Sequence, residues 1–230
     1  MRRRRAALAA GAVAAAVSAA IVVPGGSADG SSVLRHGSVV ARLRGNGVSL
    51  RAAPGSTRVL AVVDGRTQFG SRTTLPVVSF RGRWLEVIST ALPNGVHGFI
   101  RLDQTWLRRD PVAIDVDLSA RRLRVWRDGV VVRRVDVAIG APSSPTPIGQ
   151  FAVTDELTGL DPAAYGCCIL ALSGHQTRLP SGWPGGDRLA IHGGGGIGSA
   201  VSSGCLHAAE PDLRWLMRQV PLGTQVMIHP

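Results

Sequence analysis

The sequence contains no lysine, although it carries 26 basic residues, which are therefore all arginine. A phosphate-binding P-loop needs a lysine after its glycines, so this absence excludes that class of nucleotide site. Aromatic residues are also scarce, with one tyrosine and four phenylalanines in 230 residues. Four arginines stand together at residues 2–5, and without them 22 basic residues face 15 acidic ones, a net charge of +7 instead of +11. This reduced charge argues against a nucleic-acid-binding protein.

The first residues have the pattern of an export segment. The basic residues 2–5 precede residues 6–23, which carry no charge and are mostly alanine, and Pro24 and two glycines follow. A basic start, an apolar stretch and a small-residue exit are typical of a secretory signal. We expect residues 1–30 to be an export signal, with an uncleaved membrane anchor as the alternative. Either interpretation places the rest of the chain outside the cytoplasmic membrane.

Cysteine is rare, and its count is odd: the chain holds Cys167, Cys168 and Cys205. In an oxidising compartment an odd count leaves at least one thiol unpaired. Cys167 and Cys168 begin an apolar run that reads as a buried strand, so they are expected to be small core residues, with a strained vicinal disulfide as the alternative. Cys205 follows a polar, glycine-rich stretch, which is where we expect a reactive thiol.

The remaining pattern predicts a mainly β fold in two parts. Residues 31–110 alternate short apolar runs with turn signals such as Asn46-Gly47 and show no helical period, which predicts a small all-β module. Residues 111–230 contain a strong hairpin signal at Asp128-Gly129 and several further strand patterns. Their one convincing helix covers residues 211–220, where Leu213 and Leu216 are among the apolar residues at helical spacing.

The stretch from His192 to His207 contains the candidate nucleophile and the candidate base. His192 ends a predicted strand, and Cys205 follows thirteen residues later. A thiol is a strong nucleophile only as the thiolate, and an imidazole within reach can accept its proton and later deliver it to a leaving amine. Backbone N–H groups of Ser203, Gly204 and Cys205 are expected to form an oxyanion hole for an acyl intermediate.

Three other interpretations of this stretch compete with a cysteine nucleophile. Glycines 193, 195 and 198 match G-x-G-x-x-G, but no crossover helix follows, which argues against a dinucleotide site. His192, Cys205 and His207 form the candidate ligand set of a zinc hydrolase, without an obvious fourth ligand. The third interpretation is a purely structural glycine loop beside a buried thiol. It does not explain why the chain accepts the entropic cost of ordering four successive glycines next to a histidine.

Ordered motifs between residues 114 and 228 resemble the L,D-transpeptidase family, the YkuD domain. They comprise His192-Gly193, Ser202-Ser203-Gly204-Cys205, the Thr146-Pro147-Ile148-Gly149-Gln150-Phe151 segment and Pro221-Leu222-Gly223-Thr224. Two positions depart from the family pattern, because Ser203 stands where His is frequent and His207 where Arg or Asn is usual. Residues 31–110 resemble a bacterial Src-homology-3-like wall-binding barrel, and a β-sandwich spacer without a ligand is the alternative.

The resemblance implies a YkuD-type β-sandwich with one docked helix and an enzyme acting on peptidoglycan stem peptides in the cell wall. Cys205 would be the nucleophile, His192 the proton donor and acceptor, and the Gly193 carbonyl would orient His192. Carbapenems would acylate Cys205, and no metal or cofactor is implied. The candidate substrate-binding residues are Ser202, His207, Tyr165 and His175, with Arg178 and Trp183 as further candidates for lining the cleft. A catalytically inactive wall-binding protein and a zinc-dependent wall peptidase are the alternatives.

Overall fold

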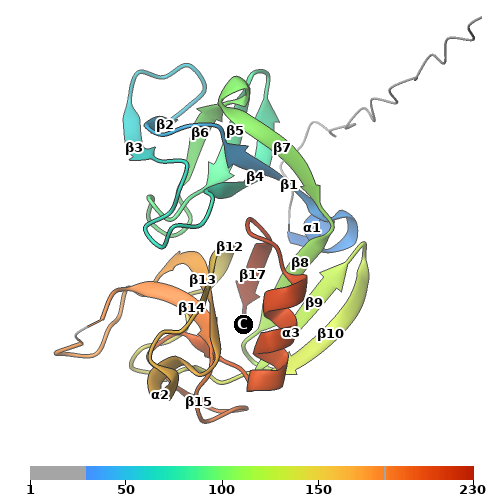
Figure 1. Cartoon of the computed structure of the whole chain (residues 1–230), viewed down its shortest axis with the longest axis vertical. Coiled ribbons are helices and arrows are strands. Elements are labelled where there is room, and N and C mark those ends of the chain that lie inside the picture. The colour runs from blue at the N-terminus through green and yellow to red at the C-terminus, as the bar shows by residue number, and fades with distance from the viewer. Residues whose placement is uncertain (1–29, 184) are drawn as a thin grey trace, which may run out of the picture.

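The computed structural model describes residues 30–183 and 185–230, and within them the mainly β prediction is confirmed. Two β-rich units follow one another along the chain, and the polypeptide passes from the first to the second through adjacent strands β7 and β8 (Figure 1). The predicted export segment lies outside the described residues. Among the described helices, none has the length and apolar character needed to cross a membrane.

The N-terminal unit is a seven-stranded antiparallel sheet with the order β3-β2-β6-β5-β4-β1-β7. Leu50, Leu85 and Ile100 are fully buried at its centre. The turn between β4 and β5 uses Gly82 at a φ of +60°, a backbone conformation that glycine adopts without strain. Its elements are β1 (Ser38–Leu43), β2 (Val48–Arg51), β3 (Val59–Val63), β4 (Thr74–Arg81), β5 (Trp84–Ile88), β6 (His97–Arg101), the 3-10 turn Leu102–Gln104 and β7 (Thr105–Asp110).

The prediction that residues 31–110 contain no helix is wrong at their start. There α1 (Gly30–His36) forms two turns of helix, and its one buried side chain is Val33. Val33 packs against Ala113 and Met227, so this helix covers the second unit. A helix of seven residues with a single buried position shows no hydrophobic period, which is why the pattern did not predict it.

The second unit is a curled, mixed eight-stranded sheet with the order β10-β9-β8-β17-β12-β13-β14-β16. Two of its neighbouring pairs are parallel, β8 with β17 and β14 with β16. A parallel two-stranded sheet of β11 and β15 lies beside it. The strands are β8 (Val112–Asp117), β9 (Arg122–Arg127), β10 (Val130–Asp136), β11 (Ile139–Gly140), β12 (Gly149–Thr158), β13 (Cys168–His175), β14 (Arg188–His192), β15 (Ala200–Ser202), β16 (Leu206–His207) and β17 (Gln225–His229).

The helix predicted at residues 211–220 is confirmed as α3 (Glu210–Gln219), which lies across the sheet (Figure 1). Leu213 and Leu216 are fully buried in the core of the second unit. Pro211 occupies the first turn, where its missing N–H costs nothing. A second, four-residue helix, α2 (Pro162–Tyr165), is also present, beyond the one helix that the sequence predicted for residues 111–230. One turn carries too few residues to display a period.

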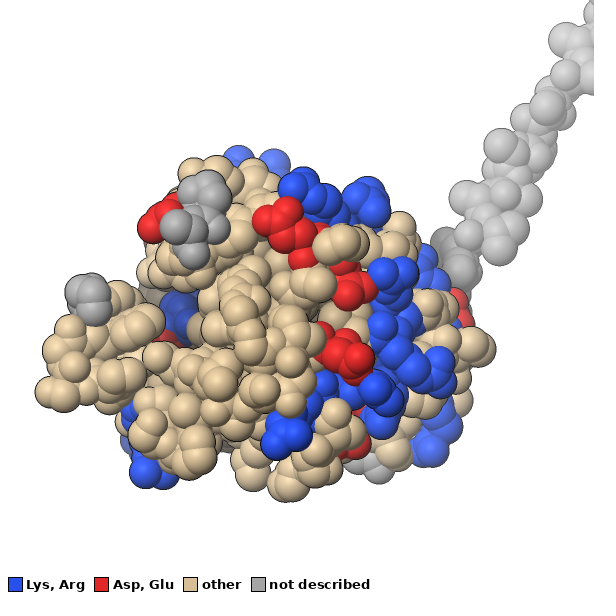
Figure 2. Space-filling view, turned by 90° about the horizontal axis from the view of Figure 1, so that it is seen from below, with Lys and Arg blue, Asp and Glu red and all other residues tan. Residues whose placement is uncertain are grey.

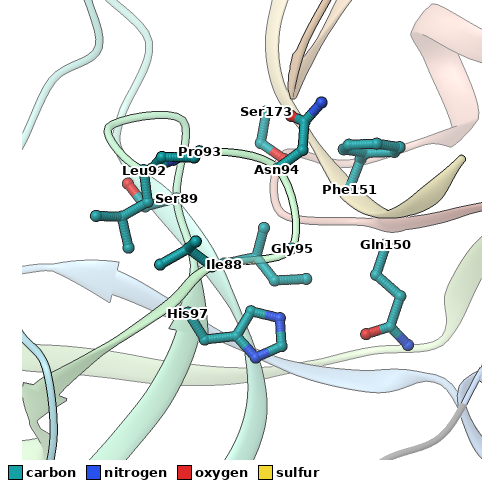
Figure 3. Close-up of a pocket in the computed structure, with 11 residues that line it drawn as sticks. Ile88, Ser89, Leu92, Pro93, Asn94, Gly95, His97, Gln150, Phe151 and Ser173 are labelled. Carbon is teal, nitrogen blue, oxygen red and sulfur yellow. The ribbon is translucent and has the colours of Figure 1, made fainter. Parts of the chain in front are cut away.

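The two units contact each other where a side chain of the first unit forms hydrogen bonds with the backbone of the second. The Asn94 side chain donates to the His175 carbonyl at 2.7 Å and accepts the His175 N–H at 2.8 Å. Figure 3 shows Asn94 beside Ser173, on a loop of the first unit that lies against the second. The small cavity lined by these residues and Phe151 has a volume of about 10 Å³, room for about one water molecule. A loop of the first unit is therefore packed directly onto β13.

Candidate active site

Strand β14 sets the position of His192 by its alternation of faces. Leu189 and Ile191 point into the core and are almost completely buried. Side chains two residues apart on a strand share a face, so Arg188, Ala190 and His192 lie together on the opposite face. All three line a cavity of about 490 Å³. Figure 2 shows this side of the molecule hollowed between a projecting arm and the main body.

His192 is held as a neutral base. Its Nδ1 lies 2.5 Å from the Gly193 carbonyl oxygen. Since a carbonyl only accepts, Nδ1 carries the proton and Nε2 keeps its lone pair. Burial lowers the pKa of His192 to about 4, the Gly193 hydrogen bond opposes this shift, and the charge of His207 adds to it. At neutral pH the ring is therefore uncharged, with one nitrogen available to accept a proton.

Gly193 is itself fixed by the segment that contains α2. Its N–H donates to the Tyr165 carbonyl at 2.7 Å. The Tyr165 ring meets the His192 ring edge to face, with 5.1 Å between centroids. Gly166 and Gly193 touch through their backbones, because a β-carbon on Gly193 would lie 2.7 Å from the Gly166 Cα. Only glycine at both positions permits this approach, which brings Tyr165 over the imidazole.

The parallel pairing of β14 with β16 brings Cys205 to the same cavity as His192. His192 is paired with His207, so Cys205 stands just before β16 and beside Ala190. Its Sγ lies 3.8 Å from the Arg188 carbonyl oxygen. Cys205 is a half-buried free thiol, and burial raises its pKa above the ordinary value. A protonated thiol therefore faces the cavity that a neutral imidazole also lines.

The loop before Cys205 is braced by the side chain of Ser202 within it and by that of Gln176, which follows β13. The Ser202 hydroxyl donates to the Cys205 carbonyl at 2.6 Å and accepts the Gly204 N–H at 3.1 Å. Gln176 donates to the Ser203 carbonyl at 3.1 Å and to the Pro145 carbonyl at 3.0 Å. In this structure the Gly204 N–H is thus engaged by Ser202. Its participation in an oxyanion hole stays a prediction and requires that this bond give way.

His207 lies beside the catalytic candidates. Its ring centroid is 4.8 Å from that of His192, and its Nδ1 lies 3.0 Å from the Gly195 carbonyl oxygen. The glycine run after His192 therefore folds over His207. The glycine run therefore has a role in local packing, and this role accounts for a feature that the sequence alone left unexplained.

The structure places the remaining candidates in two groups. Those that line the cavity with His192 and Cys205 are Tyr165, Ser202, Ser203, His207 and Trp183. His175 instead lies at the contact between the units, where its Nε2 is 2.8 Å from the Thr90 carbonyl oxygen and its Nδ1 is 3.0 Å from Asp187. Arg178 is exposed and lies outside the described lining of the cavity.

Gln176, Arg188 and Phe69 are among the lining residues that sequence reasoning missed. The alternation of β14 contained a signal for Arg188, four residues before His192 on the same face. No local pattern pointed to Phe69, because it belongs to the N-terminal unit. Gln176 follows β13, and nothing in the sequence distinguished it from its polar neighbours.

Cys167 and Cys168 form a vicinal disulfide in the structure, so the favoured expectation of two separate core residues is corrected. Cys168 is also 5 % exposed and belongs to the core, as its apolar surroundings suggested. Cys205 is the free cysteine. As for the zinc alternative, residues 30–183 and 185–230 bring no three His, Cys, Asp or Glu side chains together in a group that could hold a metal ion.

Comparison with known proteins agrees with these motifs. A protein of Bacillus licheniformis that carries the name L,D-transpeptidase YkuD is 30 % identical over 125 residues, which cover 52 % of this chain and 67 % of that protein. The L,D-transpeptidase (Yku) of Stackebrandtia nassauensis is 19 % identical with a TM-score of 0.39, over 54 % of this chain and 57 % of that chain. The catalytic domain of the E. faecium L,D-transpeptidase, solved in a form acylated by ertapenem, is 20 % identical with a TM-score of 0.38, over 53 % of this chain and 99 % of that chain.

The family match covers the second unit. The model of the YkuD family, the L,D-transpeptidase catalytic domain, matches residues 111–228, just over half of the chain. The resemblance of residues 31–110 to a Src-homology-3-like barrel lies outside that match and stays a prediction. On the strength of the matched residues, the chain belongs to the L,D-transpeptidase (YkuD) family.

Proposed function

We propose that the chain is an exported L,D-transpeptidase that acts on peptidoglycan stem peptides. The observation that carries this proposal is the pairing of a free thiol with a neutral imidazole along one cavity. Cys205 supplies the nucleophile, and the Gly193 carbonyl keeps the lone pair of His192 on Nε2. Membership of a peptidoglycan cross-linking family supports the choice of substrate.

In the proposed first step, Cys205 Sγ attacks the carbonyl of the diamino acid that precedes the terminal D-alanine. The pKa of the thiol is raised and that of the imidazole is lowered, so the resting pair is neutral. The proton therefore moves from Sγ to His192 Nε2 as the carbon–sulfur bond forms. Collapse of the tetrahedral intermediate breaks the peptide bond, and His192 returns the proton to the departing D-alanine amine.

In the second step, the side-chain amine of a neighbouring stem peptide attacks the thioester. Its nitrogen forms an amide with the diamino acid carbonyl, the carbon–sulfur bond breaks, and the displaced proton returns to the thiol through His192. The product is a cross-link between two diamino acids. If water attacks instead, the same intermediate yields a carboxypeptidase product.

Incubation of the protein with a purified stem tetrapeptide tests this function. We expect mass spectrometry to show loss of D-alanine together with a cross-linked dimer, because the thioester can react with a second peptide. Loss of D-alanine without dimer would assign a carboxypeptidase instead. Recovery of unchanged peptide would contradict the proposed function.

The proposed mechanism also predicts an unusual pH dependence. The base form of His192 is needed for attack, and its pKa is about 4 instead of the ordinary 6.5. We expect kcat/KM for D-alanine release to stay nearly constant from pH 7.5 to about 5.5 and to fall as the pH approaches 4. A tenfold loss between pH 7 and 5.5 would contradict a buried neutral imidazole. The unfolding transition measured at each pH separates this effect from acid unfolding.

A further inference from the structure

One permanent positive charge lies in the described lining of the catalytic cavity, that of Arg188. The resemblance to the family predicts Arg or Asn two residues after the nucleophile, but this position holds His207. A stem peptide carries carboxylates, so a cleft that binds it gains from a cation near the nucleophile. Arg188 is the residue whose charge meets this requirement.

Arg188 is close to the nucleophile through its own backbone. Its carbonyl oxygen lies 3.8 Å from Cys205 Sγ, and its side chain lies on the cavity face of β14. The side chain extends over β13 to Thr154 on β12, whereas Cys205 stands before β16 at the other edge of β14, and both residues line the same cavity. The side chain is 15 % exposed, and this exposure leaves it open to a ligand in the cavity.

Hydrogen bonds to the neighbouring strands β13 and β12 fix the orientation of the Arg188 guanidinium. Nε donates to the Leu172 carbonyl at 2.9 Å, and Nη2 donates to the Thr154 hydroxyl at 2.7 Å. Asp155 Oδ2 lies 3.8 Å from Nη2, so it balances the charge without a short hydrogen bond. Within the described residues these contacts engage Nε and Nη2. Nη1 takes part in none of them.

The N-terminal unit completes this arrangement through residues 67–69. The Thr67 hydroxyl donates to Oδ1 of Asp155, whose side chain is completely buried. The Phe69 ring stands over the Arg188 guanidinium with 5.8 Å between Cζ and the ring centroid. Gln68 and Phe69 also line the catalytic cavity. One end of the cleft therefore belongs to the first unit.

We propose that Arg188 binds a carboxylate of the donor stem peptide and that residues 67–69 of the N-terminal unit position it for this role. Thr67 acts through Asp155, and Phe69 covers the guanidinium and limits its access to water. A carboxylate paired with Arg188 would hold the donor with its scissile carbonyl near Cys205. This inference rests on the proposed function, but its first test, a binding measurement, does not depend on turnover.

Binding to a chain that cannot react is the direct test. Calorimetry measures the affinity of the stem tetrapeptide for the Cys205→Ala chain and for the same chain with Arg188→Gln. A charged hydrogen bond lost from a partly buried site predicts at least tenfold weaker binding. Arg134→Gln, on the exposed face of β10, is the matched control and should bind as the parent does. Equal affinity with and without Arg188, or no binding by the parent, would overturn the proposal.

Two variants in the N-terminal unit keep the test independent of the folding of β14. Thr67→Val and Phe69→Ala, in the otherwise unmodified chain, should each raise KM severalfold and leave kcat nearly unchanged. Val62→Ala replaces an exposed side chain of the same unit and should change neither quantity. A fall in kcat at constant KM would contradict a role in positioning Arg188.

Chemically modified peptides identify the carboxylate. One tetrapeptide is amidated at the terminal D-alanine, and another at the diamino acid. The modification that removes the partner of Arg188 should weaken binding to the Cys205→Ala chain but cause no further loss once Arg188→Gln is present. Loss of the same size in both backgrounds, for both peptides, would overturn the assignment.

The outcomes separate this inference from the proposed function. Binding that depends on Arg188 without D-alanine release would reject the transpeptidase activity and retain the carboxylate site. D-alanine release that is unaffected by Arg188→Gln would retain the activity and reject the site.

Discussion

The Cys205→Ala variant is expected to form no covalent adduct with a carbapenem and to release no D-alanine from a stem tetrapeptide. The reaction needs a nucleophilic sulfur, and Cys205 is the free cysteine of the chain, because Cys167 and Cys168 are bonded to each other. Intact-mass spectrometry after incubation with a carbapenem measures the adduct. A carbapenem is the reagent because the family resemblance implies that this class of β-lactam acylates Cys205.

The control for Cys205→Ala is its unfolding temperature. Cys205 is half-buried, so removal of one sulfur atom should change the transition little. An adduct that persists in the alanine variant of normal stability would show that another group is acylated, and this would refute the assignment of the nucleophile.

Replacement of His192 by glutamine is expected to lower the rate of carbapenem acylation at pH 7 by at least about a hundredfold. The thiol stays protonated at this pH because burial raises its pKa, and glutamine cannot accept its proton. Stopped-flow or time-resolved mass measurement of the acylation rate tests this. Unlike the loss in Cys205→Ala, this loss should shrink as the pH rises and hydroxide supplies thiolate.

His97→Gln is the matched control for His192→Gln. His97 also has a partly buried ring with a fixed partner, Glu86 at 3.0 Å, but it lies in the N-terminal unit. Its replacement should leave the acylation rate unchanged. If His192→Gln and His97→Gln react at the rate of the unmodified chain, His192 is no base and the inactive wall-binding alternative gains support.

The sequence could predict those features that local patterns determine. The apolar spacing around Leu213 and Leu216 located α3, and a strand that ends in His192 placed the imidazole at the edge of a sheet. The polar, glycine-rich surroundings of Cys205 distinguished it from Cys167 and Cys168. Each of these inferences uses residues within about fifteen positions of one another, over which periodicity and turn chemistry are informative.

Features that depend on contacts between distant segments could not be predicted. Phe69 reaches the cleft only because the two units pack together, and Thr67 meets Asp155 across 88 positions of the chain. His175 looked like a cleft residue from its place before His192. His175 lies at the contact between the units because the loop that carries Asn94 packs against it. No sequence pattern near His175 predicts this contact.

The backbone contact between Gly166 and Gly193 has a consequence for how this protein tolerates substitution. Gly193, whose carbonyl accepts from His192 Nδ1, is itself held by the main-chain carbonyl of residue 165, and every amino acid supplies such a carbonyl. The two glycines, in contrast, have no substitute, because a β-carbon on either would lie within 2.9 Å of the other's Cα. In a saturation library, residues 166 and 193 should therefore accept no replacement although neither has a side chain. At residue 165 the same library would report only what the tyrosine ring contributes.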